Sequence, residues 1–260
     1  MANKKLTTLR FWEEYWDDKK KVPENKKQSL LTLELLKVFK KYLKPDSALK
    51  ILEIGGAPGE YLLYMLDQFH YSVHSLDYSG IGNQKTIENF KKAGREVEVF
   101  ERDLFSDNLD LPLFDIVYSL GFIEHFDDPS KAIEKHVSLL KPGGILMIGV
   151  PNLTGIYHVF LKFLSPSHDK SHNLKIMDLN NWSLFENAFK LEPVFKSYIG
   201  GFEPLIMKKR DVRTPFTWIL LIIVKVLMVI FSFRLKFLRK FNSRFWSGYL
   251  IGIYKKPFAR

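Results

Sequence analysis

Residues 50–60 read Lys-Ile-Leu-Glu-Ile-Gly-Gly-Ala-Pro-Gly-Glu, and this stretch decides the fold. Residues 51–54 are apolar apart from Glu53 and predict a buried strand, while residues 61–66 have the composition of a helix. The glycines between them permit backbone angles that other residues rarely adopt, and they let a ligand lie against the main chain. They are Gly55, Gly56 and Gly59. A strand, a glycine turn and a helix in this order are typical of a doubly wound α/β fold.

The rest of the chain alternates between strand and helix patterns. Further strands are expected at residues 73–77, 97–100, 115–120, 145–150, 193–199 and 247–257. Helical spacing of apolar residues predicts helices at residues 8–18, 30–43, 83–93, 130–140 and 182–189. This alternation predicts a doubly wound, mostly parallel sheet of seven strands with right-handed crossovers.

The spacing within the glycine turn separates two classes of cofactor site. A dinucleotide site has the pattern G-x-G-x-x-G, which faces a pyrophosphate. Here Glu53, Gly55, Ala57 and Gly59 alternate, and a carboxylate ends the strand where a pyrophosphate would be poorly placed. This pattern resembles motif I of the class I S-adenosylmethionine-dependent methyltransferases, (D/E)-x-G-x-G-x-G, with alanine at the middle glycine. The resemblance implies a Rossmann-like methyltransferase fold and S-adenosylmethionine as the cofactor.

Later strand ends extend the resemblance over residues 50–152. Asp77 ends the second strand, where the family's carboxylate accepts hydrogen bonds from both ribose hydroxyls. Asp103 follows the third strand, where the family binds the adenine amino group. Ser119 begins the segment after the fourth strand, where the family lines the methionine end. The resemblance therefore implies these cofactor-binding residues: Glu53, Gly55, Gly56, Ala57, Gly59, Asp77, Tyr78, Asp103, Leu104, Ser119, Leu120 and Gly121.

The segment Phe122-Ile-Glu-His-Phe-Asp-Asp-Pro129 bears on the acceptor. It is similar to the L-E-H-x-x-D-P pattern of small-molecule methyltransferases, including those of ubiquinone biosynthesis. It differs from the N/D-P-P-Y/F element of enzymes that methylate amino groups of nucleic-acid bases. Alcohol and phenol acceptors must lose a proton, and an imidazole can titrate near neutrality. We therefore expect His125, with Glu124 beside it, to be catalytic, or else to fix the loop; no metal site is predicted.

The N-terminal residues are expected to form a helix outside the cofactor-binding core. Residues 8–18 carry Phe11, Trp12, Tyr15 and Trp16 at the spacing of a short amphipathic helix. In many relatives such a helix is a lid over the cofactor, but the same aromatic side chains also fit a helix packed on the core. We divide the chain into a helical cap (1–45), a cofactor-binding core (46–207), an apolar and basic helical insert (208–246) between strands six and seven, and a final strand (247–260).

The insert contains residues 216–233, which include a single charge, Lys225, and are followed by a basic run to residue 240. This length is at the lower limit for a membrane span. A single span is opposed by topology, because the final strand must rejoin the same sheet. Two alternatives remain: a helix in the membrane interface with basic flanks against anionic headgroups, or a buried helix that covers the acceptor pocket or a second copy of the chain.

Composition bounds the function further. The chain has 260 residues, no cysteine and a formal net charge of +10, so disulfides, thiolate metal sites and a cysteine nucleophile are excluded. The charged N-terminus predicts no secretory signal. We expect O-methylation of a small or lipid-linked acceptor in the cytoplasm, with peripheral contact at the inner face of the membrane through residues 216–240 and with homodimer formation left open. The alternatives are a non-catalytic membrane-attached binding module and an RNA-directed methyltransferase, although a nucleic-acid partner is not favoured.

Overall fold

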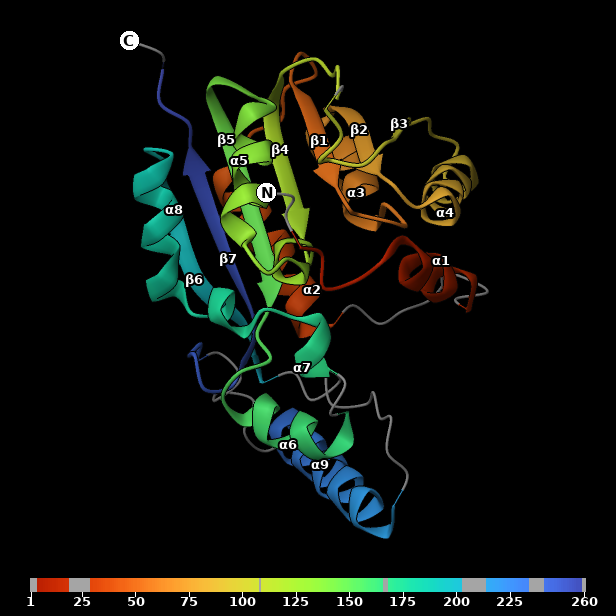
Figure 1. Ribbon diagram of the computed structural model, residues 1–260, viewed down its shortest axis with the longest axis vertical. Helices are drawn as coiled ribbons and strands as arrows, with labels where there is room; N and C mark the ends of the chain where they lie inside the picture. The colour runs from red at the N-terminus through yellow and green to blue at the C-terminus, as the bar shows by residue number, and fades with distance from the viewer. Residues whose placement is uncertain are drawn as a thin grey trace.

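The computed structural model describes residues 4–18, 29–107, 109–165, 168–202, 214–233 and 241–258. Its centre is a seven-stranded sheet with the order β3-β2-β1-β4-β5-β7-β6 (Figure 1). The strands are β1 (Lys50–Ile54), β2 (Ser72–Asp77), β3 (Glu98–Glu101), β4 (Phe114–Leu120), β5 (Leu140–Pro151), β6 (Glu192–Phe202) and β7 (Ser247–Lys255). β1 to β5 pair in parallel, whereas β7 is antiparallel to both of its neighbours. The predicted doubly wound, mostly parallel sheet is confirmed.

The helices follow the expected segments, with shifted ends. They are α1 (Leu9–Asp18), α2 (Leu30–Tyr42), α3 (Glu60–Phe69), α4 (Gly80–Lys92), α5 (Pro129–Ser138), α6 (Ile156–Leu164), α7 (His168–Ser171), α8 (Ser183–Ala188) and α9 (Pro215–Phe233), with short 3₁₀ helices η1 (Ile123–His125), η2 (Leu174–Met177) and η3 (Leu179–Trp182). α4 begins three residues before the prediction because the Ser79 side chain accepts a hydrogen bond from Gly82 N and caps the helix. The helix predicted to residue 140 ends at Ser138, because Leu140 already pairs with Phe114 in the sheet.

Apolar side chains form one layer on each face of the sheet. Phe39 of α2 and Met65 of α3 belong to one layer, together with Ile51 and Tyr118 from the strands. The other layer contains Ile133 and Trp182, from α5 and η3, with further side chains of α6 and α8. Helices on both faces therefore sandwich the sheet, as a doubly wound fold requires.

α6 and α9 lie side by side beyond one end of the sheet (Figure 1). The Phe163 and Phe216 rings join them, with centroids 5.6 Å apart. α9 begins where the Thr214 and Thr217 side chains accept hydrogen bonds from each other's backbone N–H. Among the described side chains of α9 only Thr217 and Val224 are buried within the chain, so the expectation of a helix that covers the acceptor pocket or a second copy stays a prediction. No helix in the described ranges combines the length and hydropathy that a membrane crossing needs.

A buried histidine connects α5 to the sheet. His136 Nδ1 lies 2.7 Å from the Ala132 carbonyl oxygen, and Nε2 lies 3.0 Å from Ser119 Oγ. A carbonyl oxygen only accepts, so Nδ1 carries the proton and Nε2 accepts from the serine hydroxyl. Burial lowers the pKa of His136 to about 4, against the opposing effect of the Ala132 hydrogen bond. The folded protein therefore holds this imidazole neutral.

This histidine predicts a pH-dependent loss of stability. The unfolded chain binds a proton at residue 136 below about pH 6.5, whereas the folded chain does so only near pH 4. Stability therefore falls as the pH drops from about 6.5 towards 4, by at most about 1.4 kcal/mol per pH unit from this group. His136→Gln keeps one donor and one acceptor but does not titrate. In thermal unfolding, the melting temperature of this variant should fall less than that of the wild type between pH 7.5 and pH 5.0. If both melting temperatures change equally with pH, the assignment to His136 is wrong.

Candidate functional site

The glycine turn after β1 is closed tightly against its surroundings. Gly55 and Gly59 have φ values of +66° and +76°, in the left-handed region that favours glycine. A Cβ atom built on Gly55 would lie 2.4 Å from the Phe122 ring, and one on Gly56 would lie 2.0 Å from Glu53 Cδ. The turn therefore tolerates no side chain at residues 55 and 56, and its backbone is left bare.

Glu53 is buried directly against this turn, with 1% of its surface exposed. Its Oε2 atom has no hydrogen-bond partner among the described residues, and neither has the nearby Tyr118 hydroxyl. Burial raises the pKa of Glu53 to about 8; the Tyr118 hydroxyl opposes this rise through its proximity, although it makes no hydrogen bond of ordinary geometry, and the Asp77 charge adds to it. A buried, unpartnered carboxyl oxygen beside a bare backbone is suited to a polar group of a ligand.

A pocket with about 450 Å³ of empty space, part of it open to solvent, lies at the carboxyl ends of the first strands. Six residues expected at the site line it: Gly55, Asp77, Tyr78, Asp103, Leu104 and His125. Lining residues that the sequence reasoning missed are Lys5, Thr7, Ile54, Leu76, Arg102, Phe122 and Phe126, and Trp12 joins them from α1. Of the apolar ones, Ile54 and Leu76 could have been expected, because they directly precede Gly55 and Asp77 at two strand ends. No sequence pattern indicates Lys5 or Thr7.

Asp77 is the principal carboxylate of the pocket. Its Oδ1 accepts a hydrogen bond of 2.9 Å from Ser79 N, which orients the side chain at the end of β2. Burial raises the pKa of Asp77 to about 6, against the opposing backbone N–H groups of Ser79, Tyr78 and Ala57. Glu13 of α1 adds to the rise through its charge. Above this pH the carboxylate is an acceptor for two neighbouring hydroxyl groups.

The N-terminal segment forms one wall of the pocket. Lys5 bridges antiparallel to Phe126, and Leu6 N donates to the His125 carbonyl oxygen at 2.8 Å. The Lys5 ammonium makes an ion pair with Asp103 and lies 4.6 Å from the centre of the Tyr78 ring. This segment is held to the loop after β4 by backbone hydrogen bonds, although about 120 residues separate the two in the sequence.

α1 combines the two arrangements that the sequence left open. The Trp12 side chain lines the pocket, and its Nε1 donates to Thr7 Oγ1 at 3.1 Å. The Trp16 side chain is buried and lies beside Gly82, at the start of α4. One face of the helix therefore borders the site while another packs on the core.

Other residues expected at the site lie outside the pocket lining. Glu53, Gly56, Ala57, Gly59, Leu120, Gly121 and Glu124 are beneath or beside it rather than among its lining residues. Ser119 requires a correction, because its side chain points into the core and donates to His136. Successive side chains of a strand point to opposite faces, so Tyr118 faces Glu53 and Ser119 faces α5.

Glu124 and His125 stand in η1, on the loop after β4. His125 Nδ1 lies 2.8 Å from the Ser171 carbonyl oxygen, so Nδ1 is the donor and Nε2 is the unprotonated nitrogen of the neutral ring. Nε2 lies 3.8 Å from Glu124 Oε1. Burial raises the pKa of Glu124 to about 8, and its Oε2 has no hydrogen-bond partner among the residues described. The Trp12 ring meets the imidazole edge-on at 5.1 Å.

The residues present fit an adenosine derivative. Apolar side chains of Ile54, Leu76, Leu104 and Phe126 offer walls for a flat base, and Asp77 offers a carboxylate for a ribose. The bare turn and the unpartnered Glu53 oxygen lie next to this pocket, where a further polar part of the ligand would be held. Within the described ranges, no group of three or more His, Cys, Asp or Glu side chains could hold a metal ion.

The Asp77 carboxylate predicts pH-dependent binding of S-adenosylhomocysteine, which carries the same adenosine. Binding should weaken as the pH falls through about 6, because protonation removes the charged acceptor. Asp77→Asn should bind about 10–100-fold more weakly at pH 8 and show little of this pH dependence. Isothermal titration calorimetry at pH 8.0, 6.5 and 5.5 measures both effects.

Glu101→Gln is the matched control, because Glu101 ends β3 beside Asp77 in the sheet and does not line the pocket. Its affinity should follow that of the wild type at every pH. Equal affinities of Asp77→Asn and the wild type at pH 8 would show that the ribose does not lie at Asp77.

Comparison with known proteins agrees with this geometry. A family model described as a methyltransferase domain matches residues 24–197. The putative sarcosine dimethylglycine methyltransferase from Galdieria sulphuraria is 15% identical, with a TM-score of 0.57 over 87% of this chain and 84% of that one. Geranyl diphosphate C-methyltransferase from Streptomyces coelicolor A3(2) is 10% identical, with a TM-score of 0.58 over 86% and 79%. At these identities the likeness shows the fold.

A third structure, coclaurine N-methyltransferase, is 14% identical, with a TM-score of 0.56 over 89% of this chain and 75% of that one. No curated protein sequence matches this chain significantly. The family model covers more than half of the 260 residues and includes the glycine turn, Asp77, Asp103 and His125. The chain therefore belongs to the methyltransferase domain family and is an S-adenosylmethionine-dependent methyltransferase of class I.

Proposed function

We propose that this enzyme methylates a hydroxyl oxygen of a small or lipid-linked acceptor, with His125 as the general base. The observation that carries the proposal is the hydrogen bond from His125 Nδ1 to the Ser171 carbonyl oxygen, which fixes the tautomer. In that tautomer Nε2 keeps its lone pair, on a side chain that lines the donor pocket. A base is needed for an alcohol or phenol acceptor, since such a hydroxyl holds its proton at neutral pH.

When bound, S-adenosylmethionine supplies an electrophilic methyl group on a sulfonium. The protein has to align the acceptor oxygen with that group and to remove its proton. We infer that His125 Nε2 takes the hydroxyl proton as the oxygen attacks the methyl carbon and the bonding electrons return to sulfur. The Ser171 carbonyl then holds the imidazolium in place through the unchanged Nδ1 hydrogen bond.

Glu124 is proposed as a positioning residue for this histidine. Its backbone oxygen accepts a hydrogen bond of 2.7 Å from Asn173 N, and the Asn173 side chain donates to the carbonyl oxygens of Phe126 and Asp127. The segment after α7 thereby clamps the loop that carries the base. The Glu124 carboxyl beside Nε2 is largely protonated at neutral pH and becomes a partner for the imidazolium when it ionises.

We infer the nature of the acceptor from the side chains that line the pocket beside His125. Trp12 and Phe122 line the pocket beside His125, and such aromatic walls favour an apolar molecule over a polar one. Two of the similar structures are a nitrogen and a carbon methyltransferase, so the fold alone does not select the acceptor atom. The choice of oxygen follows from the base.

Mutation of His125 tests the catalytic role. His125→Gln should lower kcat by about 10²–10⁴-fold while the affinity for S-adenosylhomocysteine stays unchanged, because general-base catalysis has this magnitude. The loss should shrink at high pH, where more of the acceptor is already ionised. A structural role would instead reduce donor binding or thermal stability.

His172→Gln is the control, because its ring lies against that of His125, with centroids 4.7 Å apart. It should retain activity. If His172→Gln is as slow as His125→Gln, or if His125→Gln turns over at the wild-type rate, the assignment of the base is wrong.

Labelled S-adenosylmethionine tests the acceptor class. The enzyme is incubated with lipid and metabolite extracts, and mass spectrometry locates the label. We expect it on an oxygen of a small molecule or a lipid. Label confined to RNA or protein, or carried on nitrogen or carbon, would overturn the proposal.

A further inference from the structure

α6 and α9 lie side by side beyond the end of the sheet (Figure 1), and both carry exposed apolar side chains. On α9 the buried Thr217 and Val224 lie seven residues apart, two helical turns, and face inwards. The opposite side of the helix carries an exposed set of apolar residues, which we call the outer face. It consists of Trp218, Ile219, Ile222, Ile223 and Val226, each between 43% and 58% exposed.

Neighbouring elements extend this apolar surface. Val159 and Phe163 of α6 are 57% and 47% exposed, and Phe163 packs against Phe216 of α9. Phe245, on the segment that leads back to β7, is 60% exposed. Single exposed apolar side chains are common on protein surfaces, but a group of them on two adjoining helices, α6 and α9, indicates an interaction site.

The charge of this part of the chain indicates what covers the surface. Residues 212–246 contain seven lysines and arginines and no aspartate or glutamate. Lys225 lies exposed among the apolar residues of α9. A second copy docked by the same face would bring two sets of like charges together, whereas an anionic bilayer would complement them. Tryptophan and long cationic side chains also suit the headgroup region, where one end of each side chain is apolar and the other wet.

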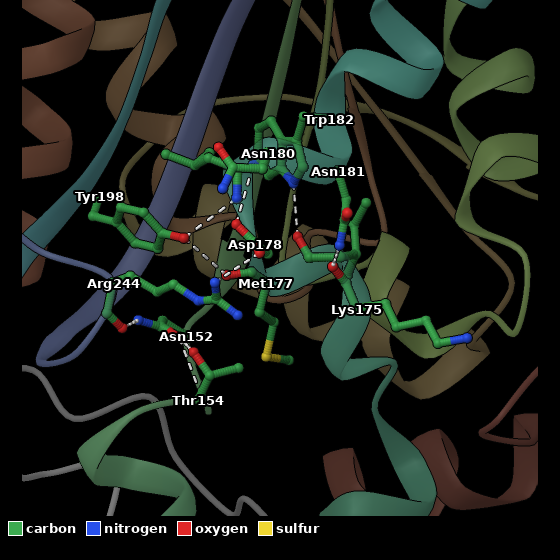
Figure 2. A network of polar contacts seen from close by, with 12 residues as sticks. Asn152, Thr154, Lys175, Met177, Asp178, Asn180, Asn181, Trp182, Tyr198 and Arg244 are labelled. Atoms are coloured by element: carbon green, nitrogen blue, oxygen red, sulfur yellow. Dashed lines mark hydrogen bonds and ion pairs between the residues drawn. The ribbon is translucent and has the colours of Figure 1, made fainter.

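Residues 241–246 are joined to α6, because Ile156 N donates to the Phe245 carbonyl oxygen at 2.8 Å, and they are also tied to the sheet edge that carries the site. Asp178 forms an ion pair of 2.8 Å with Arg244, and Asn152 Nδ2 donates at 2.8 Å to the Arg244 carbonyl oxygen (Figure 2). Asn152 directly follows β5, whose carboxyl end lies at the same edge as the glycine turn. A partner that binds α9 would therefore lie close to the edge of the sheet that carries the glycine turn.

We propose that the outer face of α9, with the exposed side chains of α6, docks into the headgroup region of an anionic lipid bilayer. α9 then lies along the interface, and β7 returns to the sheet on the same side of the membrane. This inference does not depend on the acceptor or on the role of His125.

Vesicle flotation with the full-length protein tests the proposal, without donor or acceptor present. The protein should float with phosphatidylcholine vesicles that contain phosphatidylglycerol, much less with phosphatidylcholine alone, and less as salt is raised. Ile219→Asp/Ile222→Asp should reduce the bound fraction roughly tenfold or more, because two charges would enter the interface. Lys225→Glu should weaken binding to the anionic vesicles in particular.

Leu184→Asp is the matched control, since Leu184 is 74% exposed on α8, away from this unit. It should bind vesicles as the wild type does, and circular dichroism should show that all variants are folded. The proposal is overturned if the wild type floats with neither vesicle or if the double variant binds as well as the wild type. It is also overturned if the outer face instead forms a dimer in light scattering that Ile219→Asp/Ile222→Asp disperses, with no vesicle binding.

Discussion

Burial of the Glu53 carboxyl against the backbone of Gly56 is the constraint on which the site depends. The carboxyl fills the space that a Cβ atom on Gly56 would need, and the Phe122 ring does the same for Gly55. These two contacts bring the end of β1 against the loop that carries His125. Gly55 N also donates to the Leu76 carbonyl oxygen at 2.9 Å, which places the end of β2 and its Asp77 beside the turn. One tight turn thus sets the positions of three separate strand ends.

Burial destabilises the ionised form of the Glu53 carboxyl. With a pKa near 8, Glu53 is largely neutral at physiological pH, and a nearby positive charge would favour its ionised form. Burial likewise raises the pKa of Glu124 to about 8. Burial, followed by the charges of Glu124 and Glu53, also raises the pKa of the Tyr249 hydroxyl. The protonation of the buried Glu53 and Glu124 carboxyls therefore depends on the charge of the ligand that binds beside them.

The sheet and the strand-end residues could be predicted from the sequence because both depend on local patterns. Apolar periodicity locates strands, and parallel strands bring their carboxyl ends to one edge, so Asp77 and Asp103 were expected together. The Ser119 side chain points away from the pocket because its neighbour Tyr118 faces Glu53, and successive side chains of a strand alternate between the two faces. Lys5 could not be predicted, since its pairing with Phe126 is a contact between distant segments without any local signal. The exposure of α9 was likewise beyond the sequence, because a uniformly apolar helix does not indicate which of its sides is covered.

The bridge between residues 4–7 and the loop after β4 joins the N-terminal segment to the support of His125. The His125 carbonyl oxygen accepts from Leu6 N, while its imidazole is held by Ser171 from the opposite side. The wall beside the nucleoside pocket and the support of the base are therefore parts of one assembly. Lys5, Thr7 and Trp12 precede the stretch that the family model matches. The part of the chain within the family match supplies most of the pocket, and the segment before it completes one wall.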